Sequence, residues 1–229
     1  MSTAVPTRPA TAAPPLVEGQ RLDQPEFHAR YEAAPGTRAE LINGVVFMPS
    51  PVGLDHGDAH ACAIIWLGWY AEHTPGVQVL DNATAILDRR NEPQPDACLR
   101  VRPASGGQSR DEGRYMAGAP ELVVEVAQSS RYLDLGPKFD GYERAGVREY
   151  VVRAFRPEEV LWYALEEGRF VAVAPGPDGL HRSRAFPGLW LDPQALLAGD
   201  TRRLREAVGL GLASPEHAAF LDRLGTARA

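Results

Sequence analysis

Lys138 is the only lysine among the 24 basic residues of this chain, because every other basic position holds arginine. An arginine-biased genome can leave one lysine by accident, so residue type alone does not establish a role. A lysine ammonium, however, is a compact point charge that can shift its pKa and orient a water molecule, which a planar guanidinium does poorly. We therefore interpret Lys138 as a residue with a chemical role.

Glu125 interrupts the most apolar run of the chain, residues 122 to 127. A lone buried carboxylate is costly unless it is protonated, paired with a cationic side chain or bound to a metal ion. Arg131 or Arg148 could provide a structural ion pair. A divalent cation is the alternative, and in either case Glu125 needs a partner.

Asp96 and Glu125 are expected on adjacent strands, where they would supply the one or two carboxylates that Mg²⁺ usually takes from a protein. Side chains at 125 and 127 project to the same face of a strand. Because Ala127 is small, a long side chain from the next helix could fill the space beside it, and Lys138 is in position to do so. Asp134 and Tyr142 lie one helical turn before and after Lys138 and are candidate supports for it.

The elements that must position these groups follow from hydrophobic periodicity and turn signals. Asn43-Gly44 predicts a tight hairpin, which places Glu40 on a strand that enters the turn. The polar, glycine-rich segment 103–118 predicts a mobile loop. We expect helices over 24–33, 55–73 and 135–145 and beyond Asp192, and strands over 38–42, 45–48, 77–80, 83–87, 97–101, 122–127, 149–152, 160–164 and 169–173.

Length and composition predict one domain over residues 21–229 with a C-terminal helical extension, preceded by a disordered Pro/Ala-rich tail over residues 1–20. The net charge of -6 argues against a protein that coats nucleic acid through bulk electrostatics, although a local basic groove remains compatible with it. No apolar run is long enough to span a membrane, and a cytoplasmic protein is expected. Cys62 and Cys98 are expected to be free, buried thiols.

Ordered short motifs between about residue 26 and residue 190 resemble the Uma-type family of restriction endonucleases, within the PD-(D/E)XK nuclease superfamily. Upstream are Glu40-Leu41-Ile42-Asn43-Gly44, Ser50-Pro51, His56-Gly57 and Gln94-Pro95-Asp96; downstream are Val123-Val124-Glu125-Val126-Ala127, Ser129-Ser130, Asp134, Gly136, Lys138, Tyr142, Ala145-Gly146-Val147 and Glu149-Tyr150. The chain departs from the family pattern at Gln128, Val151 and Arg153-Ala154, none of which is a proposed ligand.

The resemblance implies an α+β mixed sheet flanked by helices, the restriction-endonuclease-like core, and a metal-dependent endonuclease. Asp96, Glu125 and the backbone carbonyl of Val126 would hold Mg²⁺ or Mn²⁺, and Lys138 would orient the attacking water or neutralise charge on the phosphate. Lys138 replaces the lysine that the superfamily usually carries at position 127. Glu40 would bind a second metal ion or hold Lys138.

The sequence leaves the roles of two histidines open. His56 and His60 are four residues apart, a spacing that zinc sites use, but no third ligand is evident. We expect His56 as a polar group at the mouth of the site and His60 as a half-buried helix residue, and a structural role remains open for both.

Nucleic acid, DNA rather than RNA, is the expected partner, with a homodimer as the geometry that would cut both strands. Two alternatives stay open. One is a catalytically silent nucleic-acid-binding module of a defence or mobile-element system, and the other is a metal-free hydrolase that uses Glu125 as general base.

Overall fold

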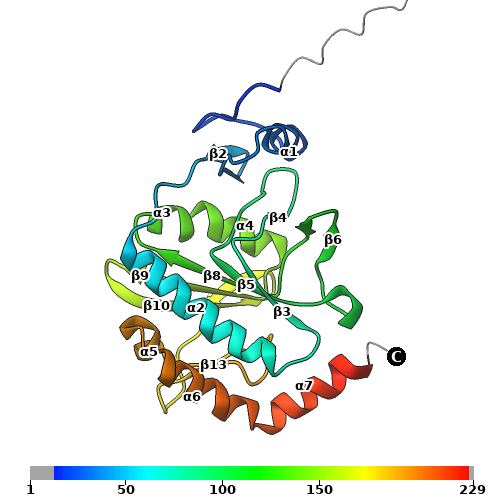
Figure 1. Cartoon of the computed structure of the whole chain (residues 1–229). Coiled ribbons are helices and arrows are strands. Elements are labelled where there is room, and N and C mark those ends of the chain that lie inside the picture. The colour runs from blue at the N-terminus through cyan, green and yellow to red at the C-terminus, as the bar shows by residue number, and fades with distance from the viewer. Residues whose placement is uncertain (1–12, 227–229) are drawn as a thin grey trace, which may run out of the picture.

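A six-stranded mixed sheet forms the centre of the structure, a computed structural model that describes residues 13 to 226 (Figure 1). Its strands, in spatial order, are β11 (Arg169–Ala172), β10 (Glu158–Glu166), β9 (Glu149–Phe155), β8 (Leu122–Ala127), β5 (Ala97–Val101) and β3 (Val77–Asp81). β8 and β9 are parallel, and the other neighbouring pairs are antiparallel. Every residue of β8 is buried, as expected for a central strand covered on both faces.

Helices cover both faces of this sheet, which confirms the predicted architecture. One face carries α2 (Leu54–Glu72), α5 (Pro193–Ala198), α6 (Thr201–Leu212) and α7 (Pro215–Thr226); the other carries α3 (Arg131–Asp134) and α4 (Pro137–Ala145). The buried residues of α2 recur three or four positions apart, so one stripe of the helix faces the sheet. Alternate residues of β8 face the two layers: Val124 packs with α2, and Val123 packs with Tyr142 of α4.

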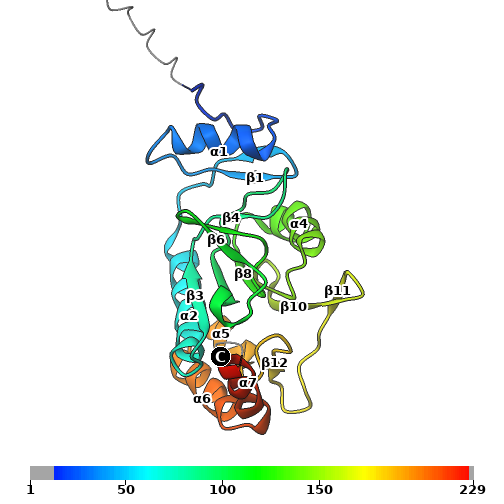
Figure 2. The same ribbon diagram turned by 90° about the vertical axis from the view of Figure 1, so that its right-hand side faces the viewer.

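The N-terminal elements lie at one end of the molecule, opposite α6 and α7 (Figures 1 and 2). They are α1 (Gln24–Glu32) and the hairpin of β1 (Glu40–Ile42) and β2 (Val45–Phe47). Asn43 and Gly44 adopt φ angles of 51° and 77°, so the predicted tight turn is confirmed.

The predicted tail over residues 1–20 falls partly outside the described residues, because the structure describes nothing before residue 13. Leu16 is buried against Phe27 and Val46, and Gly19 donates a backbone hydrogen bond to the Val46 carbonyl. The packed part of the chain therefore starts a few residues before the boundary that the sequence predicts.

Segment 103–118, which its composition predicts to be a mobile loop, has secondary structure. It contains the short 3₁₀ helix η1 (Pro103–Ser105) and the hairpin of β6 (Arg110–Glu112) and β7 (Tyr115–Ala117), and β7 pairs in parallel with β4 (Ala85–Ile86). β6 is fully exposed and therefore carries polar residues, which hid its strand character. A further small pair, β12 (His181–Arg182) and β13 (Trp190–Leu191), was also not predicted.

Cys62 and Cys98 are buried and free, as predicted. None of the helices described has both the length and the apolar character that a membrane crossing requires.

Candidate active site

The register of the central sheet brings Asp96 and Glu125 together. β5 and β8 are antiparallel and pair Ala97 with Val124, so the residue before β5 lies opposite Glu125. The backbone N–H of Val126 donates to Asp96 Oδ2 over 2.7 Å, and the N–H of Asp96 points at Glu125 Oε2 over 3.3 Å. Two carboxylates from adjacent strands therefore meet where β5 begins, as the sequence predicts.

Lys138 reaches these acids from α4. Its Nζ atom lies 3.1 Å from Glu125 Oε1, 3.0 Å from Glu40 Oε1 and 3.9 Å from Asp134 Oδ1. The side chain is only 6% exposed. Pro137 starts α4 and the β1–β2 hairpin supplies Glu40, so three elements that are distant in sequence converge on one ammonium group.

Further donors fix the carboxylates around Lys138. Tyr142, one turn further along α4, donates its hydroxyl to Glu125 Oε1 over 2.8 Å. The backbone N–H of Gln94 donates to Glu40 Oε1 over 2.7 Å, and Ser130 Oγ donates to Asp134 Oδ2 over 2.5 Å. Each carboxylate near Lys138 thus has a hydrogen-bond donor besides the ammonium.

Two histidines of α2 reach Asp96 from the opposite side. His56 Nε2 lies 3.5 Å from Asp96 Oδ2. His60 Nε2 lies 2.7 Å from the backbone carbonyl of Asp96 and 3.1 Å from Asp81 Oδ1. Within residues 13 to 226, no three His, Cys, Asp or Glu side chains form a metal-binding cluster, so the two histidines do not build a zinc site there.

Burial and neighbouring charges change the pKa values of Lys138 and of the carboxyl groups around it. Burial alone would lower the pKa of Lys138, but Glu125, Glu40 and Asp134 outweigh it and raise that pKa well above its usual range. Burial raises the pKa of Glu125 well above its usual range, in spite of Lys138. Burial likewise raises the pKa of Asp134 to about 6.

Asp96 differs from its neighbours. Burial pushes its pKa up, but hydrogen bonds from His56 and the Val126 N–H outweigh that effect and lower the pKa below its usual range. The hydrogen bond with Asp96 in turn raises the pKa of His56 against its own burial. Asp96 is also more accessible than Glu125, with side-chain exposures of 17% and 3%. It is therefore an ionised carboxylate within reach of solvent.

Negative charge exceeds positive charge in this cluster. Four carboxylates face one ammonium group and one imidazole, and burial first, then the neighbouring carboxylates, raise the pKa values of Glu125 and Asp134. The oxygen atoms of the Asp96 and Glu125 carboxylates are hard ligands, and nitrogen atoms of His56 and Lys138 lie beside them at 3.5 and 3.1 Å. A surplus of negative charge and a set of hard oxygen atoms fit a divalent cation such as Mg²⁺.

The structure brings together all the side chains that the sequence singled out, namely Glu40, His56, Asp96, Glu125, Asp134, Lys138 and Tyr142. Their roles in catalysis and metal binding stay predictions. The sequence reasoning missed Ser130 and the backbone N–H of Gln94 as supports of Asp134 and Glu40. The spacing of four residues between Ser130 and Asp134 was a usable signal, but no residue type marks a backbone donor.

Comparison with known proteins shows the family and the fold of the chain. A family model described as "Putative restriction endonuclease" matches residues 24–194. No curated protein matches the chain. A crystal structure titled as a putative nuclease from Anabaena variabilis shares the fold, with a TM-score of 0.58, 16% sequence identity, and coverage of 75% of this chain and 97% of that chain.

Proposed function

Because the chain belongs to the Uma2 family of restriction endonucleases, we propose that it is a divalent-metal-dependent endonuclease that hydrolyses phosphodiester bonds of nucleic acid. The observation that carries the proposal is the convergence of Asp96, Glu125 and Lys138 at one point of the sheet. Two carboxylates beside one amine supply both the ligands for a cation and a positive group for the phosphate.

Asp96, Glu125 and the carbonyl oxygen of Val126 are the groups that would hold Mg²⁺ or Mn²⁺. When bound, the cation would supply Lewis-acid stabilisation of charge on the phosphate. Asp96 is ionised and partly exposed, which suits it to bind a cation that enters from solvent.

We propose that Lys138 stabilises the negative charge that develops on the phosphate in the transition state. An ammonium has three N–H donors, and Glu125 and Glu40 occupy the directions of two. The third donor is left for a phosphate oxygen or the attacking water. Glu40 and Asp134 keep Lys138 protonated, which raises its value as an electrostatic stabiliser. Of the two roles predicted for Glu40, its 3.0 Å contact with Lys138 favours the supporting one.

Tyr142 and His56 act as positioning residues in this proposal. The Tyr142 hydroxyl holds Glu125 Oε1 on the side of α4, which leaves Oε2 to face Asp96. His56 stands beside Asp96 Oδ2 with an exposure of 16%, so it can also contact a phosphate at the mouth of the site.

Cleavage assays test the proposal directly. The purified chain is incubated with plasmid DNA, single-stranded DNA and RNA in the presence of Mg²⁺ or Mn²⁺. We expect cleavage by the parent chain and a loss of about 10²–10³-fold for Lys138→Ala, the size typical of removing one electrostatic stabiliser. Arg169→Ala is the matched control, because it removes an 82% exposed cation that pairs with Glu143, which is not one of the proposed site residues. Absence of cleavage by the parent, or equal cleavage by Lys138→Ala, contradicts the proposal.

A silent nucleic-acid-binding module is the second candidate. The net charge of -6 and the deep burial of Lys138 favour it over an enzyme. It predicts retention of nucleic acid without cleavage. Calorimetry with Mn²⁺ separates the proposed endonuclease from a metal-free hydrolase, since only a metal site loses cation binding in Asp96→Ala.

Three further expectations concern the type of nucleic acid, the oligomeric state and the location of the protein. We expect DNA in preference to RNA, a homodimer that places one site on each strand of a duplex, and a cytoplasmic location. Sedimentation of the chain with and without duplex DNA tests the dimer.

A further inference from the structure

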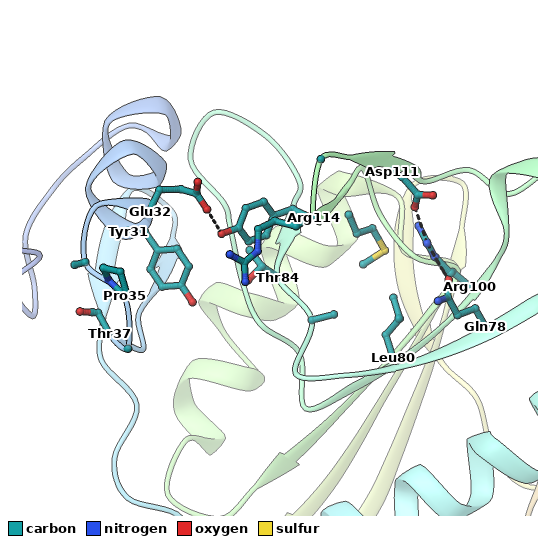
Figure 3. A pocket seen from close by; sticks show the side chains of 16 residues that line it. Tyr31, Glu32, Pro35, Thr37, Gln78, Leu80, Thr84, Arg100, Asp111 and Arg114 are labelled. Atoms are coloured by element: carbon teal, nitrogen blue, oxygen red, sulfur yellow. Dashed lines mark hydrogen bonds and ion pairs between the residues drawn. The ribbon is translucent and has the colours of Figure 1, made fainter.

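A cavity of about 560 Å³ lies beside the candidate active site, between α1, β3 and the β6–β7 hairpin (Figure 3). Its lining includes Tyr31, Leu80, Thr84, Arg100 and Arg114. We propose that this cavity receives one nucleotide of the substrate, with the base inside and its phosphate at the mouth. The inference rests on the proposed function, since it takes the ligand to be part of a nucleic acid.

The cavity shares its walls with the site. Tyr31 lines it, and its hydroxyl accepts a hydrogen bond from Gln94 Nε2 over 2.8 Å. Gln94 also donates its backbone N–H to Glu40 and stands two residues before Asp96. On the other side, the N–H of Asn82 donates to the Asp96 carbonyl over 3.2 Å, and the next two residues of the chain line the cavity. A nucleotide seated there is a near neighbour of the proposed scissile phosphate.

One guanidinium nitrogen in the cavity wall, Arg100 Nη1, lacks an acceptor. Arg100 is 6% exposed, and its Nε and Nη2 atoms donate to Gln78 Oε1 over 3.0 and 2.8 Å. Nη2 also donates to Asp111 over 2.7 Å, whereas Nη1 is buried and has no hydrogen-bond partner among the described residues. A buried guanidinium donor without an acceptor costs free energy, so such groups in folded proteins normally have a partner. Because Nη1 is itself shielded from solvent, an oxygen or ring nitrogen on the edge of a base would supply that acceptor once the Arg100 guanidinium turns toward the cavity.

The mouth of the cavity carries a cation that faces solvent. Arg114 is exposed at the turn of the β6–β7 hairpin, with its guanidinium carbon 5.6 Å from the centre of the Tyr115 ring. No carboxylate of residues 13 to 226 forms an ion pair with it, unlike Arg110 on the same hairpin, which pairs with Glu112. An unpaired arginine is well suited to bind phosphate.

In Figure 3, Tyr31 and Thr37 line the side of the cavity opposite Gln78 and Arg100.

The size and lining of the cavity fit a nucleotide. Its volume lies within the roughly 300–1,000 Å³ that small-molecule sites occupy. Leu80 and Met116 offer apolar surface for the faces of a base, and Thr84 and Gln78 offer polar groups for its edges. Enzymes that act on nucleic acid can take an unpaired base out of the stack into a pocket of this kind.

Calorimetric titration of the full chain with dGMP, dAMP, dCMP and dTMP tests the proposal, with inorganic phosphate as a further ligand. We expect at least one nucleotide to bind about tenfold more tightly than phosphate. Arg114→Ala should weaken that nucleotide about tenfold through loss of a charge-assisted contact, and Arg110→Ala should leave it within twofold. Equal loss in both variants, or equal affinity for phosphate and nucleotides, overturns the proposal.

Filling the cavity gives an independent test. Ala83→Trp places an indole in it and should abolish nucleotide binding; Thr37→Trp, at another lining residue, serves if the first variant fails to fold. The control Ala219→Trp adds the same ring to an exposed position of α7. A filled cavity that binds nucleotide like the parent overturns the proposal.

Cleavage assays distinguish this inference from the proposed function. If the parent cleaves nucleic acid and Ala83→Trp cleaves with unchanged KM, the function stands and the cavity is not a subsite. If the parent binds nucleotides but cleaves nothing, the endonuclease proposal fails while the nucleotide site remains.

Discussion

Lys138 sits where an arginine would fit poorly. Its ammonium faces carboxylates from β1, β8 and α3 at distances of 3.0, 3.1 and 3.9 Å. A compact charge with three donors suits acids that approach from several directions, whereas a planar guanidinium favours paired oxygens in one plane. This geometry gives a physical reason for a single lysine in a chain that otherwise uses arginine.

Removing the ammonium should destabilise the fold. Lys138→Met leaves Glu40 and Glu125 buried side by side without their common cation, and loss of one partner of a buried pair typically costs about 3–5 kcal/mol. Urea unfolding at pH 7 measures the free energy of unfolding. Adding Glu125→Gln to Lys138→Met removes one of the two stranded charges and should recover part of the loss. A double variant less stable than Lys138→Met would contradict this account.

Asp134 should make stability depend on pH in the acidic range. Its pKa is about 6 in the folded chain, against 3.8 as the ordinary value, because the side chain is buried. Between these values the folded state binds more protons than the unfolded state, so this group adds stability as the pH falls from about 6 to 4.

Asp134→Asn isolates that contribution. The free energy of unfolding of the parent minus that of the variant should be on the order of 2 kcal/mol larger at pH 4 than at pH 7, as measured by urea unfolding at both values. Taking this difference cancels the titrating groups that do not interact with Asp134. An unchanged difference would mean that Asp134 is not perturbed by burial.

At the scale of elements, the break between α3 and α4 determines where Lys138 points. The sequence pattern predicts one helix from 135 to 145, but α4 starts at Pro137, after Gly136 with φ -129° and ψ -103°. A Cβ atom on Gly136 would lie 2.7 Å from the carbonyl oxygen of Tyr132, which is backbone and cannot move aside easily. Glycine is therefore needed for this close approach.

Gly136→Ala should lower both stability and cleavage. We expect a loss of about 1–3 kcal/mol from the backbone clash, together with a shift of α4 that moves Lys138 relative to Glu125. The control is Gly209→Ala in α6, where a Cβ meets nothing within 4 Å and should add about 0.5–1 kcal/mol of helix stability. Thermal unfolding and the cleavage assay measure the two effects. Similar behaviour of both variants would contradict the role of Gly136.

The elements that the sequence predicts well are those with a strong local signal. Asn43-Gly44 predicts the hairpin, and the apolar run 122–127 predicts the buried central strand. β6 and β7 escape prediction because each has three residues and β6 is exposed, so their strand structure depends on pairing with each other and with β4. Short strands of this kind are determined by tertiary contacts more than by propensity.

The candidate site likewise contains residues with a strong signal in the sequence and supporting groups without one. Glu125 and Lys138 are visible in the sequence because an acid in an apolar strand and a solitary lysine are both unusual. Their supports include the N–H groups of Gln94 and Val126, which every residue type except proline provides. The cavity beside the site is also invisible in the sequence, since its walls come from α1, β3, β5 and the β6–β7 hairpin.

At the scale of the whole molecule, the fold extends beyond the part that the family match covers. The match ends at residue 194, yet Leu204 and Val208 of α6 and Phe220 of α7 belong to the same core cluster as Trp66 of α2. Trp66 also donates its indole N–H to the Trp190 carbonyl over 2.9 Å. Since α2 carries His56, the C-terminal helices support one wall of the site from a distance.

Truncating the core of α6 should therefore affect the whole molecule. Leu204 is fully buried against the cluster that contains Trp66, so Leu204→Ala leaves a cavity and should cost about 2–5 kcal/mol. Leu210 lies on the same helix but is 61% exposed, and Leu210→Ala should change stability by no more than about 0.5 kcal/mol. Urea unfolding compares the two variants by tryptophan fluorescence, which reports α2 through Trp66 and Trp69, and by circular dichroism, which also reports α6 and α7. Because the core is shared, one transition should report both α2 and α6 in Leu204→Ala. A separate early transition of the C-terminal helices, with α2 unaffected, would show instead that they are an independent attachment.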